Sequence, residues 1–193
     1  LAHVLQAAPQ GEGAALAVTQ WAWNGTTVAA GSAATIVGVG SLEINANGSF
    51  TFTPVANFNG AVPVATYTVT DGAASSTATL TIGPVAPVND APTAVNDTVA
   101  AIEDTPTVGN VLGNDSDVEG ATLTVTSFTV GGTTYAAGTT ATLPGVGSLV
   151  IASNGAFTFT PAANYTGAVP AATYTVSDGS TTSTATLTLE IGR

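Results

Sequence analysis

The sequence predicts an all-β protein made of two tandem β-sandwich domains. An internal repeat gives the number of domains: Val18–Ile82 aligns without a gap with Val125–Leu189, at an offset of 107 residues, and 42 of the 65 aligned positions are identical. Within each repeat, apolar and polar residues alternate with a period of two, and turns rich in Gly, Asn and Pro separate the runs. We find no stretch with a convincing helical period.

The repeat also predicts the domain boundaries. We expect repeat 1 to span residues 1–85 and repeat 2 to span residues 86–193, with a Pro-rich linker at residues 84–92. Repeat 2 opens with the segment TAVNDTVAAIEDTPT, for which repeat 1 has no counterpart after Leu1. We therefore expect repeat 1 to lack its first strand. Either that strand was cut from a longer rod, or a neighbouring chain supplies it.

Repeat 2 should form seven or eight short strands, because residues such as Phe157 and Phe159 alternate with threonines. Asn154-Gly155 predicts a two-residue hairpin with positive φ at both central residues. A shift of phase between Val125 and Phe128 predicts a β-bulge, and the same shift recurs in repeat 1. The expected strands are 94–102, 106–112, 121–130, a short strand after Gly131-Gly132, 148–152, 156–160, 172–177 and 183–191. This spacing is typical of an immunoglobulin-like sandwich.

Composition excludes several classes of function. The chain carries twelve acidic residues and one basic residue besides its single His, a net charge of −11, so nucleic acid and anionic membrane surfaces are not expected partners. No apolar run approaches the roughly 20 residues that cross a bilayer, so no membrane insertion is expected. There is no Cys, and no Ser/His/Asp set or nucleophile elbow accompanies the many serines and threonines. We therefore expect no enzyme activity.

The acidic residues are concentrated at the start of repeat 2, where Asn89–Glu119 holds seven of the twelve. Because the strands of a sandwich alternate in direction, the loops at 113–120 and 178–182 should meet at the end where the linker arrives. That end would gather Asn89, Asp90, Asp115, Asp117 and Asp178. Calcium binds six to eight oxygen ligands of these types, so the pattern predicts a Ca²⁺ site. Glu103 and Asp104 should lie at the opposite end, where a following domain would begin.

These motifs carry a family resemblance. The segments NDAPTAVNDTVAAIEDTP, NVLGNDSDVEGATLTV, GSLVIASNGAFTFTPAANYTG and YTVSDG resemble the cadherin-like tandem repeats of giant secreted bacterial adhesins, the type I-secreted, RTX-type surface proteins of biofilm formers. The resemblance implies a secreted, cell-surface extender module that is stiffened by Ca²⁺ at its junctions and adjoins neighbouring repeats of the same polypeptide. It implies junction ligands at Asn89, Asp90, Asp115, Asp117 and Asp178, and at Glu103 and Asp104 for the next junction.

Other interpretations stand beside this one. Any single aspartate in a turn can simply bond its own backbone, and this is the expected role of Asp71, which lacks acidic partners in repeat 1. A second functional class is a subunit of a self-assembling filament or surface layer, in which identical subunits complete repeat 1. A third is a glycan-binding module that uses Trp21 and Trp23 as a stacking platform on a cell-surface ligand, although packing in the core is the expected role of at least Trp21.

Overall fold

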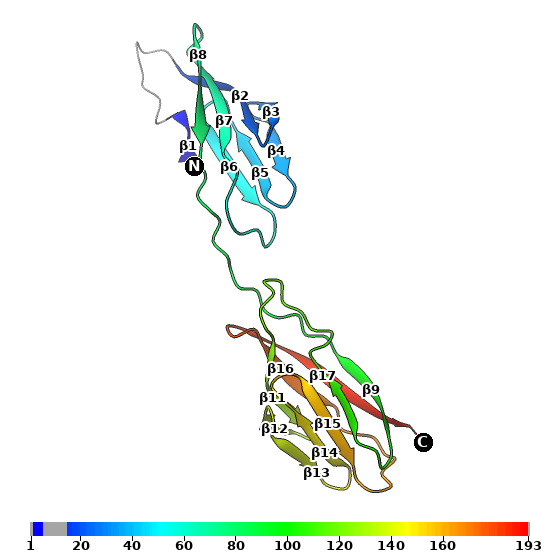
Figure 1. Cartoon of the computed structure of the whole chain (residues 1–193). Helices are drawn as coiled ribbons and strands as arrows, with labels where there is room; N and C mark the ends of the chain where they lie inside the picture. The colour runs from blue at the N-terminus through cyan, green and yellow to red at the C-terminus, as the bar shows by residue number, and fades with distance from the viewer. Residues whose placement is uncertain (1, 6–14, 193) are drawn as a thin grey trace. The chain divides into compact units, whose positions relative to one another are not determined.

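The computed structural model describes residues 2–5 and 15–192 and contains two compact units, Leu1–Val88 and Asn89–Arg193. All regular elements among the described residues are β-strands, as the sequence predicts. Each unit has two sheets (Figure 1). In each unit the sheets enclose an apolar core of its own. The chain thus consists of two tandem immunoglobulin-like β-sandwiches. Positions that are 107 residues apart in the two units are called equivalent below.

Unit 2 has nine strands in two sheets. One sheet has the order β10-β15-β14-β13, and the other has the order β12-β11-β16-β17-β9. All neighbours are antiparallel except β9 and β17, which run parallel, with Asp97 opposite Leu187. The strands are β9 (Asp97–Ile102), β10 (Thr107–Asn110), β11 (Thr124–Val130), β12 (Thr133–Ala136), β13 (Thr140–Leu143), β14 (Gly147–Ile151), β15 (Ala156–Pro161), β16 (Ala172–Ser177) and β17 (Thr182–Gly192).

Unit 1 repeats this arrangement with fewer strands. Its sheets have the orders β1-β6-β5-β4 and β3-β2-β7-β8. The strands are β1 (Ala2–His3), β2 (Ala17–Trp23), β3 (Thr26–Ala29), β4 (Ala33–Ile36), β5 (Gly40–Ile44), β6 (Ser49–Pro54), β7 (Ala65–Thr70) and β8 (Ser75–Leu80). Strand β1 is equivalent to the end of β10, because Ala2 faces Phe50 as Gly109 faces Phe157. Among the described residues, nothing in unit 1 corresponds to β9.

The period of two places one face of each strand in the core. Along β15 the phenylalanines are buried and the threonines between them are exposed, and β17 shows the same alternation. The exposed face is covered by Thr because its β-branched side chain suits an extended backbone while its hydroxyl remains in water. Both tryptophans are buried, each 1% exposed, and the Nε1 group of Trp23 donates to the carbonyl of Pro63. They therefore offer no exposed stacking platform for a glycan.

The expected bulge is present in both units, since the pairing register shifts between Val125 and Ser127 and between Val18 and Gln20. The Asn-Gly turn does join β14 to β15, but the predicted loop type is wrong. Only Gly155 has a positive φ, 81°, while the Asn154 side chain accepts a hydrogen bond from the Ala156 amide. The Gly155 amide bonds to the Ala152 carbonyl, which indicates a three-residue loop that ends in a bulge glycine. Strand β13 (Thr140–Leu143) is a separate strand that the sequence pattern does not predict.

Candidate metal centre

Asp178 begins the turn that connects β16 to β17. Its Oδ1 atom accepts hydrogen bonds from the amides of Ser180 (2.6 Å) and Thr181 (2.7 Å), and Gly179 adopts a positive φ of 99° that closes the turn. These bonds favour the charged carboxylate. The Thr181 amide, followed by the Asn89 side chain, therefore holds the pKa of Asp178 well below its usual range.

The segment that precedes β9 is attached to this turn. The side-chain amide of Asn89 donates to Asp178 Oδ2 (2.8 Å) and to Thr181 Oγ1 (3.1 Å), across 89 residues of sequence. The next residue, Asp90, donates its backbone amide to Glu119 Oε2 (3.2 Å). Residues 89 and 90 thus connect the β16–β17 turn with the loop between β10 and β11, as the topology argument expects.

Asp115 and Asp117 lie in the loop between β10 and β11, and each accepts backbone hydrogen bonds through one of its two carboxylate oxygens. Asp115 Oδ1 accepts from the Val95 amide (2.7 Å), and Asp117 Oδ1 accepts from the amides of Glu119 (3.0 Å) and Ala121 (2.9 Å). The other oxygen of each carboxylate, Oδ2, is buried and has no hydrogen-bond partner among the described residues. Burial is the main cause that raises the pKa of Asp115, and the nearby charge of Asp97 adds to it.

Asp97, to which the sequence pattern assigns no role, belongs to this region. It starts β9, and its Oδ2 atom accepts a hydrogen bond from the hydroxyl of Tyr174 (2.8 Å). The same hydroxyl lies 3.0 Å from the Val95 carbonyl and 3.1 Å from the Val111 carbonyl. Burial raises the pKa of Asp97 and that of Tyr174. Only the fold brings Asp97 to a tyrosine 77 residues away, so no local sequence signal identifies the contact.

Glu103 and Asp104 stand apart from this group. They lie in the tight turn between β9 and β10, where both side chains are exposed. Asp104 adopts a positive φ of 58°, and its Oδ1 atom accepts from the Asn164 amide (2.7 Å). No hydrogen bond connects either residue with the carboxylates around Asp115 within the described part of the chain.

Unit 1 offers a natural comparison in Asp71, which is equivalent to Asp178. The Asp71 carboxylate accepts from the amides of Ala73 and Ala74, and these bonds, with Ala74 first, lower its pKa. It performs the turn role that the sequence predicts. In the described residues of unit 1 no amide equivalent to that of Asn89 reaches it.

The donor set at the β16–β17 end of unit 2 is compatible with a hard cation. It supplies only oxygens and includes two buried carboxylate oxygens without partners, which are the atoms that a calcium ion would satisfy. Nevertheless, no group of three or more His, Cys, Asp or Glu side chains among residues 2–5 and 15–192 is arranged to hold a metal ion. A site here would need backbone and amide oxygens in addition to Asp115 and Asp117.

Comparisons with known proteins give distant structural likenesses and one family match. No curated protein matches the chain. Similar solved structures include a variant endo-fucoidan hydrolase from glycoside hydrolase family 107 (16% identity, 94% of this chain and 24% of that chain, TM-score 0.36). Another is a chimeric titin tandem (13% identity, 92% of this chain and 85% of that chain, TM-score 0.34). A third is the insect immune protein hemolin (8% identity, 90% of this chain and 39% of that chain, TM-score 0.41). This chain therefore spans about a quarter of the hydrolase, and likenesses with such TM-scores carry no argument about function.

The family model gives a more definite result. A model described as bacterial cadherin-like domain matches residues 8–86 and again residues 89–193, which is one match in each unit. Domains of this kind are extracellular or surface domains and are typically non-enzymatic. Within the described residues, no helix has the length and hydropathy required to cross a membrane. The chain belongs to the bacterial cadherin-like domain family, with one copy of the domain in each unit.

Proposed function

We propose that the chain is a pair of structural extender repeats of a bacterial cell-surface adhesin, and that Ca²⁺ binds at the β16–β17 end of unit 2. The observation that carries this proposal is the pair of buried carboxylate oxygens, Asp115 Oδ2 and Asp117 Oδ2, that have no partner among the described residues. A buried anionic oxygen without a partner destabilises the fold unless a cation or a donor satisfies it.

The composition of the chain favours a bound cation over a basic side chain as that partner. The sequence contains twelve Asp and Glu residues but only one Arg and no Lys, and that Arg is Arg193. Calcium prefers carboxylate, amide and carbonyl oxygens, which Asp115, Asp117 and the segment at Asn89 and Asp90 supply. In this proposal the ion would neutralise the local charge and fix residues 89–95 on unit 2. It would thereby shorten the flexible part of the linker and stiffen the tandem.

Calcium should raise the thermal stability of unit 2 alone. Both tryptophans belong to unit 1, so Trp emission reports on unit 1, whereas calorimetry reports on both units. At a free Ca²⁺ concentration about a hundredfold above Kd, binding adds about 2.7 kcal/mol to the free energy of unfolding of unit 2. For a domain of this size that increase raises the Tm of unit 2 by roughly 10 °C. We expect this shift in the calorimetric transition and no shift in the Trp transition.

A double variant with a matched control separates binding from a structural defect. Asp115→Asn with Asp117→Asn should abolish the calcium shift without lowering the Tm in chelator, because each Asn retains the Oδ1 acceptor and removes a buried charge. Asp71→Asn, at the position equivalent to Asp178, should leave the calcium shift intact. An unchanged Tm in calcium and chelator would refute the Ca²⁺ site.

The spacer role has its own measurement. Because the chain has no Cys, single cysteines at the exposed positions Thr53 and Thr158 accept spectroscopic labels without competing thiols. We expect the distribution of label-to-label distances to narrow on addition of Ca²⁺, and to stay broad in the Asp115→Asn, Asp117→Asn variant. Equal widths in calcium and chelator would reject the stiffening role even if the ion binds.

A further inference from the structure

A pocket lies at the end of unit 2 where β11 turns into β12 and β13 turns into β14. It has a volume of about 380 Å³, and its lining includes Val130, Tyr135, Leu143, Val146 and Pro170. Sites for small molecules have volumes of roughly 300–1,000 Å³ and are mostly apolar, so this pocket has the size and the lining of such a site.

The inner wall of the pocket is aliphatic, and one side is aromatic. Val130 and Leu143 are buried, at 1% and 7% exposure, whereas Pro170 is exposed and belongs to the rim. Tyr135 is half-buried, and its ring stacks on that of Phe128, with centroids 5.5 Å apart and an interplanar angle of 23°. This stacking fixes the tyrosine ring as a wall of the pocket. Such a lining suits a planar apolar ligand.

Unit 1 indicates what fits this space. The residue equivalent to Val130 is Trp23, which is buried at 1% exposure. Its Nε1 group donates to the carbonyl of Pro63 (2.7 Å), and Pro63 is equivalent to Pro170. An indole ring in unit 1 therefore connects two positions whose equivalents both line the pocket in unit 2.

The valine of unit 2 leaves this space open and supplies no donor. Among the described residues, no side chain donates to the Pro170 carbonyl, whereas the Pro63 carbonyl accepts from Trp23. The larger ring of Tyr135, where unit 1 has Val28, does not close the pocket. Protein interiors are densely packed, so the lining of an unfilled apolar space loses contacts that an apolar ligand can restore.

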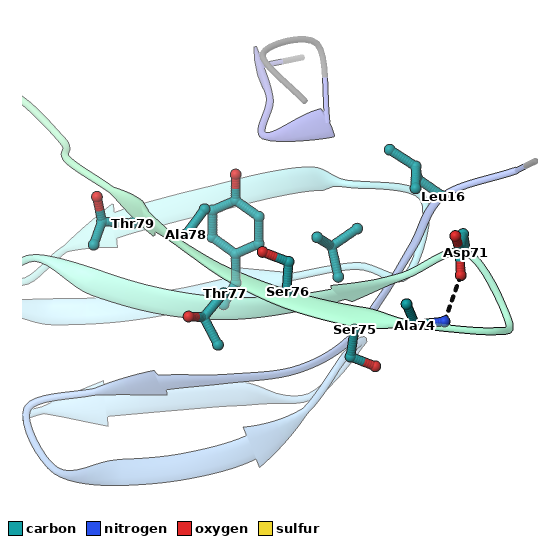
Figure 2. Close-up of a pocket in the computed structure, with 10 residues that line it drawn as sticks. Leu16, Asp71, Ala74, Ser75, Ser76, Thr77, Ala78 and Thr79 are labelled. Atoms are coloured by element: carbon teal, nitrogen blue, oxygen red, sulfur yellow. Dashed lines mark hydrogen bonds between the residues drawn. The ribbon is translucent and has the colours of Figure 1, made fainter. Parts of the chain in front are cut away.

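The hollow beside β8 of unit 1 is different (Figure 2). It is larger, about 710 Å³, but among the described residues its lining comes mainly from the Ala, Ser and Thr side chains of residues 74–79. Short side chains of this kind give little apolar enclosure, so we assign no ligand to this hollow.

We propose that the pocket of unit 2 binds a small indole-type molecule, which is a planar bicyclic aromatic ring with a free ring N–H. The ring would lie against Val130 and Leu143, beside Tyr135. Its N–H would donate to the Pro170 carbonyl, as Trp23 donates to that of Pro63. The hydrogen bond would select an indole over an aromatic ring without a donor. A structural spacer does not need a small-molecule site, so the proposal goes beyond the function above.

Indole itself is the probe for a direct test. Titrated into the full chain, indole should shift the NMR signals of the Val130, Leu143 and Val146 methyl groups saturably, with one indole per chain. 1-Methylindole has the same rings but no N–H. It should bind about fivefold more weakly, the change that corresponds to one neutral hydrogen bond.

A pair of tryptophan variants tests the position of the site. Val130→Trp should abolish indole binding, because the new side chain fills the pocket as Trp23 fills the equivalent space in unit 1. Thr158→Trp, at an exposed strand position outside the pocket, should leave the Kd for indole unchanged.

The reverse substitution in unit 1 does not depend on how Val130→Trp folds. Trp23→Val opens the equivalent space, so it should lower the Tm of unit 1 and create a second indole site. Indole should then raise that Tm again in calorimetry, and the number of indole molecules bound per chain should rise from one to two.

Three results would overturn the proposal. They are no saturable binding of indole to the wild-type chain, equal affinities for indole and 1-methylindole, and unchanged binding in a folded Val130→Trp chain. The calcium shift of unit 2 is measured without indole, so failure here leaves the spacer function standing.

Discussion

The hydroxyl of one tyrosine organises the acidic end of unit 2. Tyr174 is fully buried, and its single hydroxyl proton is shared among three nearby acceptors, the carbonyls of Val95 and Val111 and the Asp97 carboxylate. These groups come from the start of β9 and from the chain just after β10. The tyrosine therefore fixes the segment that carries Asn89 and Asp90, which in turn reaches Asp178.

The equivalent tyrosines make a matched pair for mutagenesis. Tyr174→Phe should lower the free energy of unfolding of unit 2 by about 3 kcal/mol, because it removes the single buried O–H donor that the Asp97 carboxylate and two carbonyls share. Tyr67→Phe should lower the free energy of unfolding of unit 1 by only about 1 kcal/mol. Among the described residues, the Tyr67 hydroxyl makes one hydrogen bond, to the Val4 carbonyl. Denaturant unfolding followed by circular dichroism and by Trp emission measures the two effects. Equal losses in the two variants would contradict this account.

Sequence reasoning reached some of these residues and not others. It placed Asn89, Asp90 and Asp178 at one end of unit 2, because alternating strand directions and turn dipeptides are visible locally. It assigned no role to Asp97, since the significance of Asp97 depends on a contact with Tyr174 that only the folded chain creates. It also could not identify which carboxylate oxygens are buried, and the unpartnered Oδ2 atoms of Asp115 and Asp117 are the structural basis of the calcium proposal.

At the scale of elements, local patterns predicted the strands well and their connections less well. The bulges at Val18 and Val125 followed from a break in the period of two, which any register shift must produce. The hairpin at Asn154-Gly155 was assigned the wrong loop, because Asn can cap a turn with its side chain instead of adopting a positive φ. Strand β13 was missed because four residues between glycine- and proline-containing turns give too short a pattern.

A glycine at the start of β14 allows two strands to approach closely. Gly147 has a φ of 148°, and a Cβ atom there would collide with the carbonyl oxygen of Thr160 and lie 2.9 Å from Pro161 Cα. Gly147→Ala should therefore lower the free energy of unfolding of unit 2 by about 2 to 4 kcal/mol, as measured by calorimetry. Gly113→Ala is the control, because its nearest contact would be 3.6 Å away and its φ is unstrained, so it should be neutral or slightly stabilising. A neutral Gly147→Ala variant would contradict the close approach.

At the scale of the whole chain, the two units share a sequence pattern but differ in how completely their cores are covered. Phe157 and Phe159 are buried in unit 2, whereas the equivalent Phe50 and Phe52 are half-buried. The repeat in the sequence predicts two like domains, yet it cannot give this difference in burial. The difference arises because β9 and the full length of β10 cover the core of unit 2.

This asymmetry predicts that the chain unfolds in two steps, with unit 1 first. Each large apolar side chain left half-buried forgoes about 1 kcal/mol of hydrophobic stabilisation, so unit 1 should be several kcal/mol less stable than unit 2. In chelator, the Trp emission transition, which reports unit 1, should therefore fall at least roughly 10 °C below the last calorimetric transition.

Variants identify the two transitions. Gly40→Ala, where a Cβ atom would collide with the Thr53 carbonyl, should move only the Trp transition, and Gly147→Ala should move only the later one. Ca²⁺ should widen the gap between the two transitions by raising the second. A single transition seen equally by Trp emission and calorimetry, or the reverse order, would mean that the half-buried apolar side chains do not weaken unit 1.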